Sequence, residues 1–283
     1  MLQDVTIIDS DNYEALGIST MFFPGGEPHI KVPIFTGNVF LFLKLRTWNE
    51  TTFASLLLEA LQRQETIKKL QIFIPYFPAA RQDKVADNKA ALTLSIVTSM
   101  FNTTGIIINV FDVHSPVINE YIFSYNYLPI DLNITLRENV VGIISPDKGA
   151  VERATGFRNH FYPTAELIVC GKKRNPETGE LSSGYSMPEL TKEGHYIIVD
   201  DICDGGYTFK LLTNAFEEQS VAKNSTLELF VSHGIFSKGL DALPAKISHI
   251  TTTNSFCKLE SSERLTVLKL ETLFDTIIGD SIA

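Results

Sequence analysis

The chain has 283 residues, of which 44% are hydrophobic and 20% are charged, and its formal net charge is −9. This length suggests one large domain or two of ordinary size, and the composition is typical of a globular protein with a sizeable core. The negative charge argues against a general binder of nucleic acid or of anionic membranes, because such a protein needs a basic face. A phosphate-bearing substrate is still possible, since a few local cations suffice to hold it.

Neither a membrane span nor a signal peptide is expected. No stretch approaches the ~18 apolar residues that a membrane helix needs, and the first residues show no basic region followed by an apolar run. Cys170, Cys203 and Cys257 are far apart and fit neither a zinc site nor a disulfide framework. We expect three small buried side chains and a cytoplasmic protein.

The apolar pattern predicts strands that alternate with helices. In the first half it indicates strands at 5–8, 29–35 and 39–43, a helix over 50–67, a strand at 70–75, a helix over 90–101 and a strand at 106–111. After a weaker region around 125–140, it indicates strands at 140–145, 167–170, 196–199, 227–231, 249–253 and 265–268, with helices over 150–160 and 209–218 and at the chain end.

Strands that alternate with helices are typical of βαβ units and parallel sheets. Because the pattern runs through two cycles, we predict an α/β protein with two similar domains, residues 1–138 and 139–283. Each is expected to be a mainly parallel sheet flanked by helices. The charge-rich and glycine-rich segment 171–190 is predicted to be a loop or an exposed hairpin.

The strand that begins at Tyr196 runs into Asp200 and Asp201, and a glycine loop, 204–208, then leads into a helix. Such a loop directs backbone N–H groups and a helix N-terminus towards an anion. Carboxylates at the carboxyl end of a strand can accept hydrogen bonds from sugar hydroxyls or hold a hydrated Mg²⁺. The alternative is a scaffold turn in which the aspartates only cap the helix.

Other polar residues also follow predicted strands. Arg81 and Gln82 suit a phosphate, or they belong to a solvated loop. His114 can ligate a metal, or it caps or packs locally. Asp147 can hold Mg²⁺ or cap a turn, and the cations of 172–174 can neutralise a phosphoryl group or form a solvated patch. Together they supply the parts of a site for Mg²⁺ and phosphates.

These residues, in this order, resemble the ribose-phosphate pyrophosphokinase (phosphoribosyl diphosphate synthetase) family. The resemblance runs from about Phe22 to Asn254 and is specific because several short motifs occur in register. They are Phe23-Pro24-Gly25-Gly26-Glu27, Arg81-Gln82-Asp83, Asp112-Val113-His114, Ser145-Pro146-Asp147, Asp200-Asp201-Ile202 and Ser232-His233-Gly234.

The resemblance implies two phosphoribosyltransferase-like domains, usually in dimers that build hexamers. It implies that the β,γ-diphosphate of Mg·ATP is transferred to the anomeric 1-hydroxyl of ribose 5-phosphate, with AMP leaving. The implied ATP contacts are Arg81, Gln82, His114, Phe23 and Glu27, of which Glu27 reaches the adenine in a neighbouring subunit.

The resemblance also implies roles for residues of the second half. The implied magnesium ligands are Asp147 and Asp200, together with His114. Lys172 and Arg174 would stabilise the transition state, with Arg81. Asp200 and Asp201 would bind the ribose hydroxyls. The implied 5-phosphate loop consists of Asp204, Gly205, Gly206, Tyr207 and Thr208.

That loop departs most from the family, which has D-T-x-G-T where this chain has Asp204-Gly205-Gly206-Tyr207-Thr208. One hydroxyl donor is lost, and Tyr207 stands where the backbone usually approaches the ligand. Gly25 replaces an aspartate, and the segment 84–91 has fewer arginines than the family.

The departures leave other functions open. The acceptor can instead be ADP-ribose, as in phage-borne NAD⁺-rebuilding pathways, with Tyr207 stacked on a base; a phage protein would work in the host cytoplasm. Two further alternatives are a non-catalytic regulatory paralogue and a phosphoribosyltransferase. The retained polar residues argue against the first, and the Arg81-Gln82-Asp83 motif and His114 argue against the second.

Overall fold

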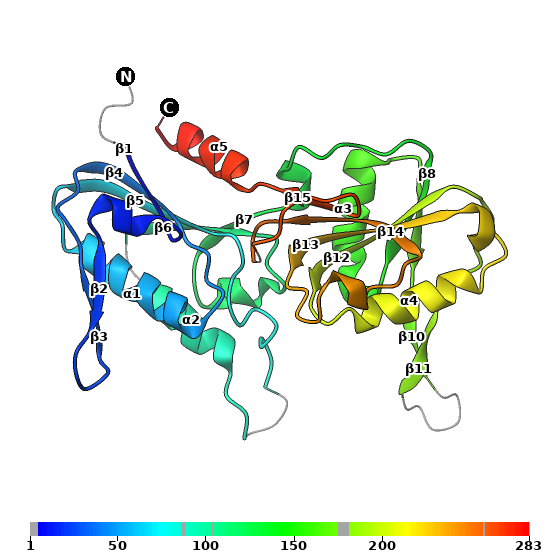
Figure 1. Ribbon diagram of the computed structural model, residues 1–283, viewed down its shortest axis with the longest axis horizontal. Coiled ribbons are helices and arrows are strands. Elements are labelled where there is room, and N and C mark those ends of the chain that lie inside the picture. The colour runs from blue at the N-terminus through cyan, green and yellow to red at the C-terminus, as the bar shows by residue number, and fades with distance from the viewer. Residues whose placement is uncertain (1–4, 86–88, 103–104, 175–180, 257, 283) are drawn as a thin grey trace. The chain divides into compact units, whose positions relative to one another are not determined.

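The structure is a computed structural model that describes residues 5–85, 89–102, 105–174, 181–256 and 258–282, and its side chains except those of 172–174 and 181–184. The chain divides into two compact units, Met1–Leu128 with Glu271–Ala283, and Pro129–Leu270. Each contains a mainly parallel sheet with helices on its faces (Figure 1), so the predicted α/β class is confirmed. The predicted division after residue 138 falls inside the second unit, and the last helix belongs to the first.

The first unit has a five-stranded parallel sheet in the order β1-β4-β5-β6-β7. Its strands are β1 Val5–Asp9, β4 Gly37–Phe42, β5 Ile67–Ile74, β6 Ile106–Phe111 and β7 Ser124–Tyr127. A separate antiparallel hairpin is formed by β2 Ser19–Phe22 and β3 Pro28–Lys31. Its helices are α1 Trp48–Gln62, α2 Thr93–Phe101 and α5 Glu271–Ile282, with 3₁₀ turns η1 Tyr13–Leu16 and η2 Pro116–Glu120.

Period-two alternation explains why this sheet is covered on both faces. Val39, Leu41 and Leu43 belong to the core under α1 and α2. Phe42 points the other way, and its ring centroid lies 5.2 Å from that of Phe274 on α5. Phe73 stacks on the same Phe274 ring at 6.0 Å. The last helix therefore completes the first unit.

Two predicted boundaries in this unit were wrong. The helix predicted over 50–67 begins at Trp48, because Thr47 and Glu50 form a capping box, and it ends at Gln62. The strand predicted at 29–35 is limited to β3, which pairs only with β2. Strand β7 escaped prediction because its sequence, SYNY, lacks an apolar face.

The second unit has a six-stranded parallel sheet in the order β15-β14-β13-β12-β8-β9. Its strands are β8 Val140–Ser145, β9 Glu166–Val169, β12 His195–Cys203, β13 Thr226–Gly234, β14 Ile247–Thr253 and β15 Leu265–Leu268. Its helices are α3 Val151–Phe161 and α4 Tyr207–Glu217, with 3₁₀ turns η3 Pro129–Asp131, η4 Lys148–Ala150, η5 Ala222–Asn224 and η6 Leu240–Ala242. β10 Gly171–Arg174 and β11 Leu181–Ser186 form an antiparallel hairpin, one of the two forms predicted for 171–190.

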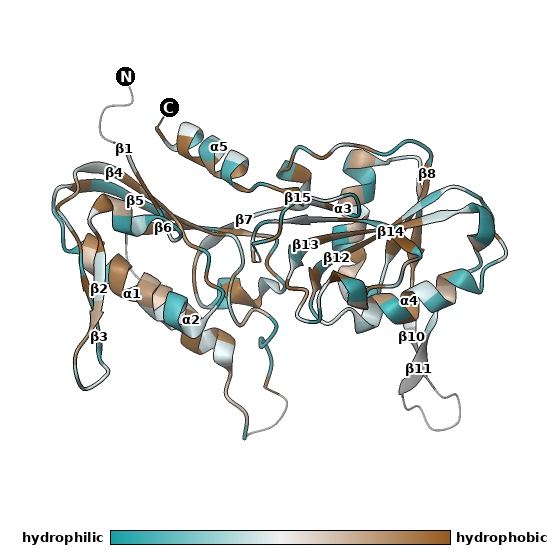
Figure 2. Ribbon diagram, in the orientation of Figure 1, coloured by the Kyte–Doolittle hydropathy of each residue, from teal (hydrophilic) through white to brown (hydrophobic). Residues whose placement is uncertain are grey.

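The two helices cover opposite faces of this sheet. Ile144, Ile198 and Leu229 share a core with α4, whereas Ile143 and Phe230 share one with α3. Both helices carry hydrophobic and hydrophilic stretches (Figure 2), as expected when one face packs on a sheet. Strand β12, in the middle of the sheet, is thereby fixed on both sides.

No helix in the described ranges is both long enough and apolar enough to span a bilayer. Cys170 and Cys203 are buried free thiols, as predicted, and burial raises the pKa of each to about 12. Cys257 lies outside the described residues.

Candidate active site

The site begins where β12 extends beyond its neighbour. Strand β8 pairs with β12 only as far as Ile144 opposite Ile198, and β8 ends at Ser145. Asp200 and Asp201 therefore project beyond the end of β8, still inside strand β12. The carboxyl edge of a parallel sheet next to a shortened neighbour leaves room for a ligand.

The two aspartates carry unbalanced charge. Burial, and then the neighbouring Asp201 carboxylate, raise the pKa of Asp200 well above its ordinary value, and Asp147 acts in the same direction. Arg153 and the backbone N–H of Asp201, which donates to Asp200 Oδ1 at 3.0 Å, oppose this rise in the pKa. Arg153 Nη2 lies 3.8 Å from Asp201 Oδ2. Among the described side chains that act on Asp200, two further carboxylates and one guanidinium are found, and an added cation would offset the repulsion among the carboxylates.

Asp147 has a structural role of its own. Its Oδ1 accepts hydrogen bonds from the backbone N–H groups of Gly149 at 2.8 Å and Ala150 at 3.3 Å, which caps η4. Asp147 therefore caps a turn, as the alternative prediction had it. Both capping bonds use Oδ1, and neither uses Oδ2. Capping also holds the carboxylate at the end of β8, in electrostatic range of Asp200.

The carboxylates of the site fit a bound Mg²⁺ if water and substrate phosphates supply the remaining ligands. Among the described residues, no group of three or more His, Cys, Asp or Glu side chains is arranged to hold a metal. Magnesium commonly takes only one or two protein carboxylates and fills its octahedron with water and substrate phosphates. Asp147 and Asp200 match that pattern, and a divalent ion would relieve the repulsion that raises the pKa of Asp200.

The loop Asp204–Thr208 leads into α4 with little side-chain support. Gly206 is the N-cap residue, with φ of 76° and no side-chain cap on the helix. The positive φ favours glycine at this position, and a Cβ added there would lie 3.0 Å from Leu243 Cδ2, which would have to shift. The first N–H groups of α4 receive no side-chain cap from this residue, and N–H groups at a helix N-terminus are suited to an anion. Tyr207 is 63% exposed at the start of the helix.

The hairpin β10–β11 carries the predicted transition-state cations. Lys172 and Arg174 belong to β10, and Lys172 is in register with Tyr185 of β11. The side chains of Lys172 and Arg174 lie outside the described ones, so their roles stay predictions.

Sequence reasoning gave no role to two residues beside this site. Tyr185 is buried: burial and the Asp147 and Asp200 carboxylates raise its pKa, and the Thr208 side chain, a hydrogen-bonding neighbour, opposes this rise. No sequence signal identified it, because only the hairpin register brings it there. Arg153 could have been found, since it lies in the first turn of α3, directly after the loop that holds Asp147.

The predicted ATP-binding residues of the first unit lie on three segments. Arg81 and Gln82 form a turn after β5, in which Gln82 N–H donates to Ala79 O at 2.8 Å. His114 is exposed just after β6, the neighbour of β5 in the sheet, so these two segments follow the same edge. Phe23 and Glu27 lie in the turn of the β2–β3 hairpin, where Phe23 N–H donates to Glu27 O at 2.9 Å.

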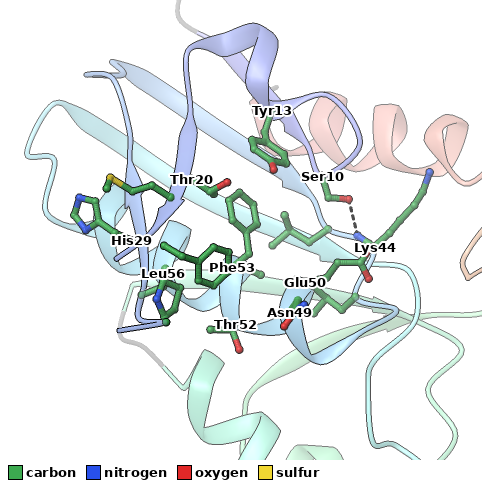
Figure 3. A pocket seen from close by; sticks show the side chains of 17 residues that line it. Ser10, Tyr13, Thr20, His29, Lys44, Asn49, Glu50, Thr52, Phe53 and Leu56 are labelled. Atoms are coloured by element: carbon green, nitrogen blue, oxygen red, sulfur yellow. Dashed lines mark hydrogen bonds between the residues drawn. The ribbon is translucent and has the colours of Figure 1, made fainter. Parts of the chain in front are cut away.

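A cavity of about 580 Å³ lies under this hairpin, against α1 and the end of β4 (Figure 3). The rings of Tyr13 and Phe53 line it with centroids 4.5 Å apart. Its cation, Lys44, is held by Asp11 at 3.2 Å and Glu271 at 3.4 Å. The cavity is not lined by the predicted ATP residues after β5 and β6, and its paired cation makes it unsuited to a phosphate.

No protein-family model matches the chain. It is similar to curated proteins named ribose-phosphate pyrophosphokinase. One from Mycoplasmopsis pulmonis is 26% identical over 75% of this chain and 67% of its own length. One from Hyphomonas neptunium is 25% identical over 67% and 61%, and one from Pyrococcus furiosus is 26% identical over 82% and 84%.

Among solved structures, the chain resembles a phosphoribosylpyrophosphate synthetase from Mycobacterium smegmatis, with a TM-score of 0.75 over 99% of both chains. At 18% identity this likeness shows the fold alone. The aligned part covers less than two thirds of the Hyphomonas relative, so activity and substrates are inferred from the chemistry of the site.

Proposed function

We propose that this chain, a divergent member of the ribose-phosphate pyrophosphokinase family, transfers the β,γ-diphosphate of Mg·ATP to the anomeric 1-hydroxyl of ribose 5-phosphate and releases AMP. The observation that carries the proposal is the group of aspartates at the carboxyl edge of β12 and β8, next to the N-terminus of α4, where the N-cap residue Gly206 makes no side-chain cap. The aspartates can bind sugar hydroxyls and a metal, and the helix N-terminus can bind a phosphate, all at one edge of one sheet.

The acceptor is bound through its polar groups. Asp200 and Asp201 accept hydrogen bonds from the ribose hydroxyls, and the backbone N–H groups of 204–208 with the Thr208 hydroxyl bind the 5-phosphate. Arg153 supports this arrangement, because its Nη2 lies 3.8 Å from Asp201 Oδ2 and favours a fixed orientation of that carboxylate.

A bound Mg²⁺ would supply charge neutralisation for the phosphate oxygens. In the second unit Asp147 and Asp200 would hold it. In the first unit His114 is proposed for the metal that accompanies ATP. The protein's own contribution is to hold these ligands in place, since capping fixes Asp147 and the strand fixes Asp200.

The transferred group needs cations more than covalent help. Lys172, Arg174 and Arg81 are proposed to neutralise the charge that develops on it. Gln82, Phe23 and Glu27 are proposed to bind ATP, with Glu27 reaching a neighbouring subunit, which implies a homo-oligomer, a dimer or a hexamer.

ADP-ribose is a second candidate for the acceptor. The observation that favours it is the 63% exposure of Tyr207 beside the phosphate loop. A free aromatic ring there can stack on the adenine of a ligand whose 5-phosphate is esterified. The chemistry at the anomeric carbon would be unchanged, and the pathway would be one of NAD⁺ salvage.

The test incubates the protein with Mg·ATP and either ribose 5-phosphate or ADP-ribose and follows AMP. AMP with ribose 5-phosphate supports the first proposal, and AMP with ADP-ribose alone supports the second. If neither acceptor yields AMP, both are wrong, and a regulatory paralogue without catalysis becomes the better account.

A further inference from the structure

Apart from the Thr208 hydroxyl, neither the loop residues 204–206 nor the N-cap of α4 brings a side-chain donor to the point where an anion would bind. The helix has 11 residues, and its N-cap, Gly206, provides no side-chain hydrogen bond. Gly205 has no side chain and can offer an anion only its backbone N–H group. Helix N-termini attract anions through free N–H groups and the helix dipole. Two residues from other elements bring the missing donors to this loop.

The first is Tyr185, on β11. It is 3% exposed, and its hydroxyl makes no hydrogen bond with the residues that the structure describes. The Thr208 side chain is a hydrogen-bonding neighbour that opposes the rise in the Tyr185 pKa caused by burial, although its contact with the hydroxyl falls short of full hydrogen-bond geometry. Asp147 and Asp200 act on it as well. Because buried hydroxyls in native proteins are nearly always paired, the Tyr185 hydroxyl is available to an oxygen of a water molecule or of a ligand bound at this loop.

The second is Lys238, an exposed residue between β13 and η6. A Cβ built on Gly205 would lie 3.5 Å from Lys238 Cε and 3.6 Å from Cδ. The aliphatic stem of Lys238 therefore lies over Gly205, which places its ammonium group at the loop. No ion pair joins Lys238 to another residue of the described ranges.

We propose that Tyr185 and Lys238 bind the phosphate of the acceptor, with the Tyr185 hydroxyl donating to one oxygen and the Lys238 ammonium pairing with its charge. The inference rests on the proposed function for the identity of the acceptor. It concerns two residues to which that proposal gives no role, and it assigns the loop to a phosphate monoester, because a monoester carries more charge for Lys238 than a diester does.

The experiment titrates the full chain with inorganic phosphate, followed by ³¹P NMR. Three variants are compared with the wild type: Tyr185→Phe, Lys238→Met and the control Lys223→Met. Met keeps the stem over Gly205 and removes only the charge. Lys223 is also exposed but lies in η5, before the amino end of β13, whereas the loop follows the carboxyl end of β12.

Tyr185→Phe and Lys238→Met should each weaken phosphate binding roughly tenfold, which corresponds to ~1.4 kcal/mol, and Lys223→Met should leave it unchanged. Without phosphate, Tyr185→Phe should melt at the wild-type temperature or above it, since no described residue loses a hydrogen bond. Unchanged phosphate binding in both variants would overturn the inference. So would a lower melting temperature for ligand-free Tyr185→Phe, which would assign its hydroxyl a structural role.

The two proposals fail separately. A wild type that binds phosphate through these residues but forms no AMP from ATP and ribose 5-phosphate would refute the proposed function alone. A wild type that forms AMP with unchanged Michaelis constants for ribose 5-phosphate in both variants would refute this inference alone.

Discussion

The two adjacent glycines of the loop should respond differently to the same substitution. Gly206 has φ of 76°, a conformation that costs an L-residue roughly 1–2 kcal/mol. An added Cβ would also lie 3.0 Å from Leu243 Cδ2, which has to shift. Gly205 has no positive φ, and its added Cβ would meet Lys238 Cε at 3.5 Å, an ordinary contact.

Gly206→Ala should therefore destabilise the ligand-free protein by about 1–2 kcal/mol, and Gly205→Ala should stay within about 0.5 kcal/mol of the wild type. For a unit of this size the first change lowers the melting temperature by about 2–8 °C. Urea unfolding and calorimetry of the ligand-free chain measure both. A Gly205→Ala cost equal to or above that of Gly206→Ala would refute the reasoning from backbone conformation.

Three further substitutions test other parts of the account. Because the pKa of Asp200 is raised by burial and by its carboxylate neighbours, the folded state holds this proton more tightly than the unfolded state, so its contribution to stability is lost as pH rises above the ordinary value of 3.8. Asp200→Asn should remove that loss: urea unfolding between acid and neutral pH should show the variant gaining on the wild type as pH rises, and a constant difference would contradict this. Lys172→Ala should slow AMP formation by roughly 10²–10³-fold with an unchanged circular dichroism spectrum, and unchanged turnover would remove Lys172 from the catalytic residues. Phe274→Ala should destabilise the first unit by about 3–5 kcal/mol, because the ring packs on Phe42 and Phe73; a loss below about 1 kcal/mol would mean that α5 is not part of that core.

The periodicity of the apolar residues and the short sequence motifs were sufficient to predict the α/β fold class. Short apolar runs rich in β-branched residues, such as those of β6 and β12, are typical of buried parallel strands when helical patterns separate them. What could not be predicted depends on contacts far apart in the sequence. That α5 returns to the first unit is decided by Phe274 meeting Phe42 and Phe73, which no local pattern encodes.

The residues of the candidate site likewise fall into those that the sequence could predict and those that depend on contacts far apart in the chain. Asp147, Asp200 and Asp201 lie just after the strands predicted at 140–145 and 196–199, so a rule about strand ends identified them, although β12 continues through both aspartates to Cys203. Tyr185 and Lys238 reach the loop from a hairpin and from the segment after β13, and their positions depend on register and on the space above Gly205. Residues of this kind become visible only when the strands are paired.

The central claim is transfer of a diphosphate from ATP to an anomeric hydroxyl. The most direct measurement is ³¹P NMR of the full chain with Mg·ATP and ribose 5-phosphate. The account predicts AMP together with new diphosphate resonances on the sugar product, in equal amounts. ADP with free phosphate, or AMP with free pyrophosphate and no new sugar diphosphate, would contradict it.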